Sequence, residues 1–352
     1  LCRSSFPGMP YVNLEGIAER EFAKTDPRGF LAQFPEGAVL DEIQRVPELL
    51  SEIQVRVDSG NTGAGYILTG SRGFDMLAHV GQSLAGRTAL LKLLPFSYEE
   101  IRHEYPNLLL DEVLFRGLYP RIYDKELNPS EALSFYVSTY VERDVRSILN
   151  VKDLGAFQLF LKLCAGRTGQ LVNLKALSDE VGISHNTVKQ WLSVLEESYI
   201  VKLVRPYFAN LNKRLIKSPK LFFLDTGLAC FLLGIQHFDQ LGAHPLRGAI
   251  FETFAYSELL KVRYNSALPD SLYFYRDLGG FEIDFILDRG VECDAVEVKS
   301  SRTLHPDFFK NLRAFGALNP RLRQSYLFYG GDENIDNYLG ARVLSWKDFG
   351  SV

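Results

Sequence analysis

Short apolar runs separated by amphipathic stretches fill the first hundred residues of the chain. The runs show no helical period, which is typical of buried parallel strands, whereas the stretches between them repeat at helical spacing. The pattern predicts strands at residues 10–15, 38–42, 66–71 and 89–97, and helices at 17–23, 29–34 and 47–57. Because strands alternate with helices, we expect a doubly wound α/β sheet in this part of the chain.

The pattern turns helical between residues 98 and 166, with an irregular break at 116–120. Within this part a long helix is predicted over 129–149. Its residues 140–145 mix acids and bases, which indicates either a solvated face or contacts with a second subunit or a nucleotide.

A compact unit follows, with helices predicted at 174–181 and 185–197 and a β segment at 199–204. Ser184 stands where it would cap the second helix. On that helix one stripe is apolar, formed by Val188, Trp191, Leu192 and Leu195. Two helices joined by a tight turn and followed by a strand predict a winged helix-turn-helix.

The opposite face of this second helix is polar and carries His185, Asn186, Lys189 and Gln190. Polar side chains at the start of a recognition helix can reach base edges in the DNA major groove. The basic stretch 205–220 includes Lys213 and Arg214, which could track phosphates. The alternatives are an interdomain packing module for the helices and a solvated loop for the basic stretch.

The last third of the chain returns to an α/β pattern. A strand is expected at the start of 220–227, then a helix at 247–261, then strands at 271–276, 281–287 and 295–300. Alternation along the last strand puts Glu297 and Lys299 on one face.

Two adjacent carboxylates, Asp41 and Glu42, end the second predicted strand. Open α/β sheets bind their ligands at the carboxyl ends of the strands. In nucleoside triphosphatases the first such acid holds Mg²⁺ and a following Glu activates water, as in a Walker B motif. The alternative is a strand that ends in solvated acids.

Composition restricts the class of protein only loosely. The chain has 352 residues, 46% hydrophobic and 23% charged, which suits two or three globular domains. No run reaches the roughly 18 apolar residues of a membrane span, so we expect a cytoplasmic protein without membrane contact. The four cysteines lack metal-ligand spacing and favour a reducing compartment. A net charge of −4 requires any DNA contact to come from a local patch.

Several short segments, in order over nearly the whole chain, resemble one known family. It comprises bacterial and archaeal predicted ATPases of the AAA type that carry a C-terminal restriction-endonuclease-like domain of unknown function. The matching segments are 11–15, 39–44, 68–71, 84–87, 140–145 and 220–227. The resemblance implies ATP and Mg²⁺ as cofactors, with Asp41 holding Mg²⁺ and Glu42 activating water. It also implies that Ser71 senses the γ-phosphate and that Arg87 is a candidate trans-acting finger in a homo-oligomer.

A second resemblance concerns the last third, where Asp284 precedes a Glu-x-Lys segment formed by Glu297 and Lys299. Together with the helical Glu252, these residues resemble the PD-(D/E)xK nuclease fold. The resemblance implies that the three acids hold Mg²⁺ and that Lys299 polarises the attacking water. Cross-strand salt bridges among the same residues are the structural alternative, and such a fold can also be kept for binding alone.

One departure from the first family is its Gly-rich phosphate loop, which ends in Gly-Lys-Thr. No Gly-Lys pair occurs anywhere in the chain, and the chain begins with Leu1. We therefore expect one of two situations. Either the start is truncated and a P-loop lies upstream of Leu1, or the ATPase domain is degenerate and does not hydrolyse ATP.

Taken together, the sequence predicts an α/β protein with a truncated P-loop/AAA-type parallel sheet, a helical region, a winged helix-turn-helix and a restriction-endonuclease-like α/β domain. The expected domain limits are 1–104, 105–165, 166–207 and 208–352. The predicted function is ATP binding and hydrolysis coupled to a DNA-associated nuclease-like domain. Two alternatives stay open: a non-hydrolysing DNA-binding regulator, and a Mg²⁺-dependent DNA nuclease that acts without ATP.

Overall fold

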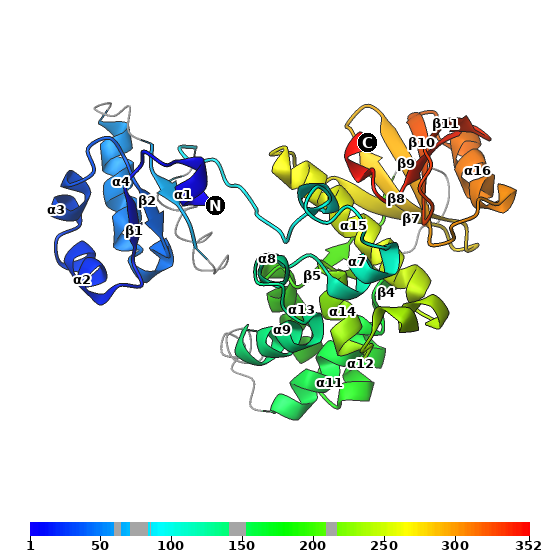
Figure 1. Ribbon diagram of the computed structural model, residues 1–352, viewed down its shortest axis with the longest axis horizontal. Coiled ribbons are helices and arrows are strands. Elements are labelled where there is room, and N and C mark those ends of the chain that lie inside the picture. The colour runs from blue at the N-terminus through cyan, green and yellow to red at the C-terminus, as the bar shows by residue number, and fades with distance from the viewer. Residues whose placement is uncertain (60–64, 71–83, 85, 141–152, 209–216) are drawn as a thin grey trace. The chain divides into compact units, whose positions relative to one another are not determined.

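The computed structural model of the chain describes residues 1–59, 65–70, 84, 86–140, 153–208 and 217–352 (Figure 1). These residues form two compact units, Leu1–Leu90 and Leu91–Val352. Among the described residues no helix combines the length and the apolar character that a membrane-spanning helix needs.

The first unit is built on a parallel sheet of three strands in the order β1 (Tyr11–Asn13), β2 (Val39–Asp41) and β3 (Ile67–Leu68). The helices of this unit are α1 (Cys2–Ser5), α2 (Ile17–Thr25), α3 (Pro27–Ala32) and α4 (Glu48–Asp58). Apolar residues of β2 and α4 form its core with Phe30 and Leu31 of α3. The predicted alternation of strands and helices is confirmed for this stretch.

The turn that leads into β2 depends on a glycine. Gly37 has φ of +101°, and a Cβ atom there would lie 2.2 Å from the carbonyl oxygen of Gly65. A side chain at this position is excluded by both the backbone conformation and the close approach. Gly37 thus lets the chain enter the central strand beside the residues that precede β3.

The strand predicted over residues 89–97 is wrong. Residues 89–94 form no strand, and Leu90, Leu91 and Leu93 are 53%, 75% and 70% exposed. A strand needs a neighbour that satisfies its backbone groups. Among the described residues, the sheet of this unit consists of β1, β2 and β3, and residues 89–94 pair with none of them.

The second unit begins with short helices. They are α6 (Tyr98–Ile101), α7 (Leu110–Arg116), α8 (Pro120–Asp124), α9 (Pro129–Tyr136) and α11 (Leu154–Ala165). The break expected at 116–120 is present, with Gly117 at φ of +66° between α7 and α8. The long helix expected over 129–149 is confirmed from its start through α9, whereas residues 141–152 lie outside the described residues.

Two helices joined by a tight turn come next, α12 (Leu174–Val181) and α13 (His185–Glu197). Gly182 adopts a left-handed conformation after α12, and the Ser184 side chain accepts a hydrogen bond from the Thr187 amide, as expected for a cap. A three-stranded antiparallel sheet packs with them, in the order β4 (Gln170–Leu171), β6 (Lys220–Phe223) and β5 (Val201–Val204).

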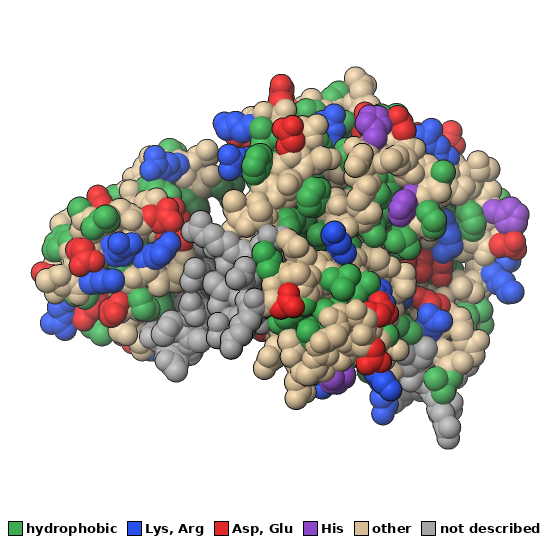
Figure 2. All heavy atoms as spheres, turned by 90° about the horizontal axis from the view of Figure 1, so that it is seen from below, with side chains coloured by type: hydrophobic (Ala, Val, Ile, Leu, Met, Phe, Trp, Pro, Cys, Tyr) green, Lys and Arg blue, Asp and Glu red, His purple; other side chains and the backbone are tan. Residues whose placement is uncertain are grey.

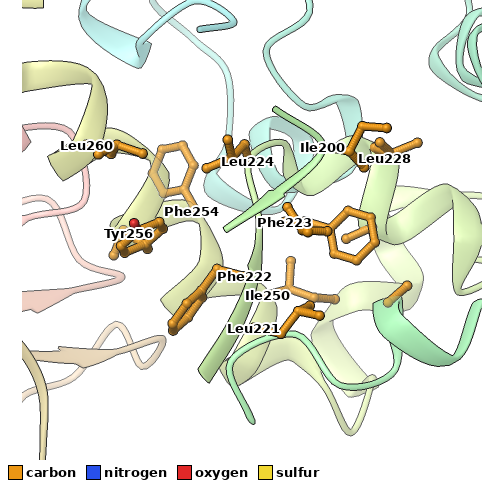
Figure 3. Packing of buried hydrophobic residues seen from close by; sticks show 14 of the residues in the cluster. Ile200, Leu221, Phe222, Phe223, Leu224, Leu228, Ile250, Phe254, Tyr256 and Leu260 are labelled. Atoms are coloured by element: carbon orange, nitrogen blue, oxygen red, sulfur yellow. The ribbon is translucent and has the colours of Figure 1, made fainter. Parts of the chain in front are cut away.

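Strand β6 is buried along its whole length and joins this sheet to the rest of the unit. Figure 3 shows its side chains packed on both sides, with Phe222 beside Tyr256 of the long helix α15 (Arg247–Asn265). The rings of these two residues stack with centroids 4.9 Å apart. One core therefore includes α12, α13, β6 and α15; we call α12, α13 and the sheet β4-β6-β5 the helix-turn-helix part.

The segment after β6 leads into α14 (Thr226–Leu232) through a buried carboxylate. Asp225 accepts hydrogen bonds from the Leu228 amide, which caps α14, and from the Leu118 amide, which follows α7. A Cβ atom on Gly227 would lie 2.5 Å from the carbonyl oxygen of Arg116. The segment 220–227 thus has a structural reason for its residues, because Asp225 and Gly227 let two helices meet closely.

The last part of the chain forms a six-stranded sheet in the order β11-β12-β10-β9-β8-β7. Its strands are β7 (Leu272–Arg276), β8 (Glu282–Asp288), β9 (Cys293–Lys299), β10 (Leu322–Tyr329), β11 (Ile335–Tyr338) and β12 (Ala341–Ser345). Strands β7, β8 and β9 are antiparallel, whereas β9, β10 and β12 run parallel.

Helices cover both faces of this sheet. Alternate residues of β9 belong to two different cores, with Val296 packed in the core of α15 and Ala295 in the core of α16 (Lys310–Leu318). The order of α15, three antiparallel strands, α16 and a parallel strand places the carboxyl end of β9 beside β8 and α15.

Candidate functional site: an acid and lysine cluster at the end of strand β9

The site begins where β8 and β9 separate. Their paired residues end at Phe285 and Val296, while β9 continues to Lys299 alongside β10. Strand β8 also carries one extra residue against β7, because Ile286 pairs with Tyr273 and Ile283 with Tyr275. Such bulges redirect side chains beside functional sites, and here the bulge lies next to Asp284.

Asp284 fills the gap in the ladder. Its Oδ2 accepts a hydrogen bond from the backbone amide of Val298 at 2.8 Å, so that the side chain of β8 replaces a main-chain partner. The Asp284 side chain is 14% exposed and that of Glu297 is 4% exposed. Folding thus buries two carboxylates at the point where two strands part.

Three oxygen atoms converge on the ammonium group of Lys299. Its Nζ lies 2.6 Å from Glu297 Oε2, 3.3 Å from Asp284 Oδ2 and 3.1 Å from the carbonyl oxygen of Val298. Two carboxylates and one main-chain carbonyl make a set of hard oxygen donors around one positive charge. We name these three atoms the oxygen triad.

The charges of this cluster are strongly coupled. Burial and the nearby Asp284 carboxylate raise the pKa of Glu297 well above its usual value. Burial also opposes ionisation of Asp284, but the Lys299 and Lys220 ammonium groups hold its pKa below the usual value. Although burial alone would lower the pKa of Lys299, the two carboxylates raise it. The cluster therefore binds positive charge in a poorly solvated place.

A second ionic group lies beside the first. Lys220 Nζ contacts Glu252 Oε1 at 2.8 Å and Glu282 Oε1 at 2.5 Å, and Glu282 also pairs with Arg276 at 3.1 Å. Lys220 is 3% exposed. Burial raises the pKa of Glu252 to about 7, although Lys220 acts in the opposite direction.

Asp284, Glu297 and Lys299 lie together, as expected. Glu252, the third expected acid, accepts a hydrogen bond from Lys220 instead of joining this cluster. Lys220 itself was expected in the basic stretch that follows phosphates, and that expectation is wrong because its ammonium group is buried between two carboxylates.

Sequence reasoning missed Glu282 and the structural role of Lys220 in this group. The period of two along β8 could have placed Glu282 near Asp284. For Lys220 no local signal exists, since its partners come from a helix and a sheet that follow it in the chain.

A divalent cation fits the oxygen triad by the chemistry of its donors. Among the described residues no group of three His, Cys, Asp or Glu side chains is placed to hold a metal ion. The triad differs from such a group, because its third oxygen is the Val298 carbonyl. Lys299 already shows that one positive charge is accommodated among these three atoms.

The carboxylates of the first unit lie at the carboxyl end of β2. Asp41 accepts hydrogen bonds from the side chains of Tyr11 on β1 and Thr69 after β3. Glu42 has φ of 58° and accepts a hydrogen bond from Gln44 Nε2 at 2.5 Å. The two acids therefore stand where an open parallel sheet binds ligands, as expected.

Two other expected residues concern the same unit. Arg87 pairs with Asp58 of α4, with 3.0 Å between its Nη2 and Asp58 Oδ2. Ser71 lies outside the described residues. The sequence contains no Gly-Lys pair.

The polar face of α13 is exposed as expected, with His185, Asn186, Lys189 and Gln190 all open to solvent. Lys213 and Arg214 lie outside the described residues. On the surface in Figure 2, basic and acidic side chains alternate in small groups.

Comparison with known families divides the chain into three parts. Residues 3–102 match a family model described as AAA domain, residues 107–239 match a domain of unknown function (DUF8612), and residues 247–349 match another domain of unknown function (DUF4143). The AAA match agrees with the parallel sheet that carries Asp41. Residues 3–102 are accordingly similar to an AAA domain.

Three similar proteins are each described as uncharacterized. It is 26% identical over 298 residues to uncharacterized proteins of Mycobacterium bovis and Mycobacterium tuberculosis, covering 84% of this chain and 65% of each relative. An uncharacterized protein of Haemophilus influenzae is 25% identical over 275 residues, covering 74% of this chain and 64% of the relative. The chain thus spans about two thirds of the length of these relatives.

The solved structures include protein VC1899 from Vibrio cholerae, which is 12% identical to this chain. The alignment covers 90% of this chain and 88% of that chain, with a TM-score of 0.25. A score this low carries no argument about the fold.

Proposed function

We propose that this AAA-type protein binds DNA through its second unit and hydrolyses phosphodiester bonds there with a divalent metal ion. The observation that carries the proposal is the convergence of the three oxygens of the triad on Lys299 Nζ. Such a set favours Mg²⁺ or Mn²⁺ over softer metals.

In this proposal the two carboxylates and the Val298 carbonyl would hold the ion, which would supply positive charge for the hydrolysis of a phosphodiester. Lys299 would leave the triad and donate a hydrogen bond to a phosphate oxygen. Asp284 keeps β9 in place through its hydrogen bond to the Val298 amide. The arrangement of a helix, three antiparallel strands and a parallel strand supports a PD-(D/E)xK nuclease-like domain.

A winged helix-turn-helix supplies the DNA contact in this proposal. Helix α13 is capped, amphipathic and exposed on its polar side, and it packs with the three-stranded sheet β4-β6-β5. Lys189 is the exposed cation on that face, and phosphate contacts by such residues weaken with salt.

The nuclease proposal is tested by incubating the purified protein with supercoiled and linear DNA in Mg²⁺ or Mn²⁺. We expect metal-dependent cleavage that Glu297→Gln and Lys299→Met each reduce at least a hundredfold. Asp288→Asn is a matched control, because Asp288 lies on β8 but pairs with Arg321. Cleavage that persists in both variants, or a wild-type protein that neither cleaves DNA nor binds Mn²⁺, would overturn the proposal.

DNA binding is tested separately by titrating a duplex at two salt concentrations. We expect Lys189→Ala to weaken binding severalfold and to reduce its salt dependence. Lys175→Ala is the control, since Lys175 is an exposed lysine on the neighbouring helix α12. Equal affinities of the wild type and Lys189→Ala would count against α13 as the DNA-binding helix.

ATP hydrolysis by the first unit is a second candidate function. The position of Asp41 at the carboxyl end of a parallel strand favours it, as does the match to an AAA domain. In this proposal Asp41 faces Mg²⁺ and Glu42 activates water. The assay uses protein purified from its own host. Mg²⁺-dependent ATP turnover that Glu42→Gln leaves unchanged would exclude this role for Glu42.

A further inference from the structure

Lys220 lies in the three-stranded sheet, and its side chain forms an ion pair with Glu282 of the six-stranded sheet. It is the first residue of β6, in the middle of the three-stranded sheet, where it pairs with Leu171 of β4 and Val204 of β5. Its ammonium group reaches Glu252 of α15 and Glu282 at the start of β8. The side chain therefore connects the helix-turn-helix part to the elements that build the metal centre.

The backbone makes a second connection between the same two sheets. After β5, the Tyr207 amide donates to the carbonyl oxygen of Phe274 on β7 at 2.7 Å, and the Phe274 amide donates to Arg205 at 3.3 Å. Strand β6 is thus held against α15 by the core in Figure 3 and near β8 by Lys220. A side chain anchored in this way has little freedom to move.

The position of Lys220 determines which carboxylates are available at the centre. Glu252 is bound to Lys220 rather than to Lys299, and no three acidic side chains converge among the described residues. Without the Lys220 charge, Glu252 would be a buried carboxylate without its ammonium partner, close to a site that attracts cations. Because Glu252 is electrostatically coupled to Asp284, a metal ion bound at Asp284 would offer it positive charge.

We propose that Lys220 is a positioning residue that keeps Glu252 out of the coordination shell of a metal ion bound at the oxygen triad. This inference rests on the metal centre of the proposed function. Lys220 makes no contact with the three triad atoms, and its ion pairs are with Glu252 and Glu282. With Glu252 on Lys220, the oxygens that would hold the ion are the three of the triad.

Calorimetric titration of the full chain with Mn²⁺ tests the proposal. We expect Lys220→Met to bind Mn²⁺ at least tenfold more tightly than the wild type, because Glu252 becomes an additional ligand. Adding Glu252→Gln to that variant should return the affinity to within threefold of the wild type. A merely structural role of Lys220 would weaken Mn²⁺ binding, and the second substitution would not reverse that effect.

Three further variants complete the test. Lys220→Arg keeps the charge and should bind Mn²⁺ as the wild type does. Lys202→Met is the matched control, because Lys202 also bridges two carboxylates, Glu196 and Asp270, on the adjacent strand β5. Glu252→Gln alone should change the Mn²⁺ affinity less than threefold. If Lys220→Met does not fold, the affinity of Glu252→Gln tests the proposal by itself.

Two results would overturn the inference: unchanged Mn²⁺ affinity in folded Lys220→Met, or a tenfold loss of affinity in Glu252→Gln. Both are distinguishable from failure of the proposed function. In that case the wild type would bind no Mn²⁺, or its binding would be insensitive to Asp284→Asn.

Discussion

Asp284 and Val298 are joined by a hydrogen bond in which a side-chain carboxylate replaces the main-chain acceptor of a neighbouring strand. The Val298 amide donates to Asp284 Oδ2 at 2.8 Å. The last paired residues of β8 and β9 are Phe285 and Val296, so Asp284 lies one residue beyond this pair and Val298 two. The same carboxylate belongs to the oxygen triad. Asp284 is therefore both a structural acceptor and a proposed metal ligand, and the two roles can be separated by substitution.

Asp284→Asn keeps an oxygen that accepts from the Val298 amide but removes the negative charge. We expect this variant to retain the wild-type fold and lose Mn²⁺ binding. Asp284→Ala also leaves the amide without its partner, which costs about 1–3 kcal/mol of unfolding free energy. Urea unfolding and Mn²⁺ calorimetry on both variants check this. If Asp284→Ala were as stable as Asp284→Asn, the structural role would be wrong.

Glu252 should make the unfolding free energy depend on pH. Its pKa rises from 4.5 to about 7 on folding, so the folded protein binds this proton more tightly than the unfolded chain does. Stability from this group is present below pH 4.5 and is lost as the pH rises to about 7. Relative to the wild type, Glu252→Gln should therefore gain up to about 3 kcal/mol between these limits.

Urea unfolding of the wild type and Glu252→Gln at pH 5 and pH 8 measures this difference. Other titrating groups contribute to both proteins and largely cancel in the comparison. A difference in unfolding free energy that stays constant, or falls with pH, would contradict the raised pKa of Glu252.

Gly227 should tolerate no side chain. A Cβ atom there would lie 2.5 Å from Arg116 O and 2.7 Å from the Gly117 amide nitrogen, and backbone atoms cannot give way cheaply. We expect Gly227→Ala to lower the unfolding free energy by roughly 2–4 kcal/mol. Gly248→Ala is the control, because Gly248 lies in α15 with nothing within 4 Å. That change should be neutral or stabilise by up to about 1 kcal/mol.

The four cysteines should differ sharply in reactivity. Cys164, Cys230 and Cys293 are buried, and burial raises the pKa of each thiol, whereas Cys2 is partly exposed. We expect a thiol reagent to label Cys2 alone in the native protein and all four cysteines in denaturant. Mass spectrometry of labelled peptides identifies the sites. Rapid native labelling of Cys164 or Cys230 would show that the second unit opens locally.

Local patterns predicted most elements correctly where a single period dominated. The helix α13 could be predicted with its cap at Ser184 and its buried stripe, because a capping side chain and a period of 3.6 are properties of neighbouring residues. The parallel strand that ends at Asp41 can likewise be predicted from its apolar run. The strand predicted over residues 89–97 does not form, because an apolar run forms a strand only beside a strand that can pair with it.

The sequence by itself determined which residues of the candidate site share a strand, since alternation puts Glu297 and Lys299 on one face. Only the tertiary structure decided what each charge contacts. The bulge in β8 brings Asp284 to the Val298 amide, and the packing of β6 against α15 brings Lys220 to Glu252. These pairings join residues 14 and 32 positions apart. No local period carries such information, because it arises from the way whole elements pack.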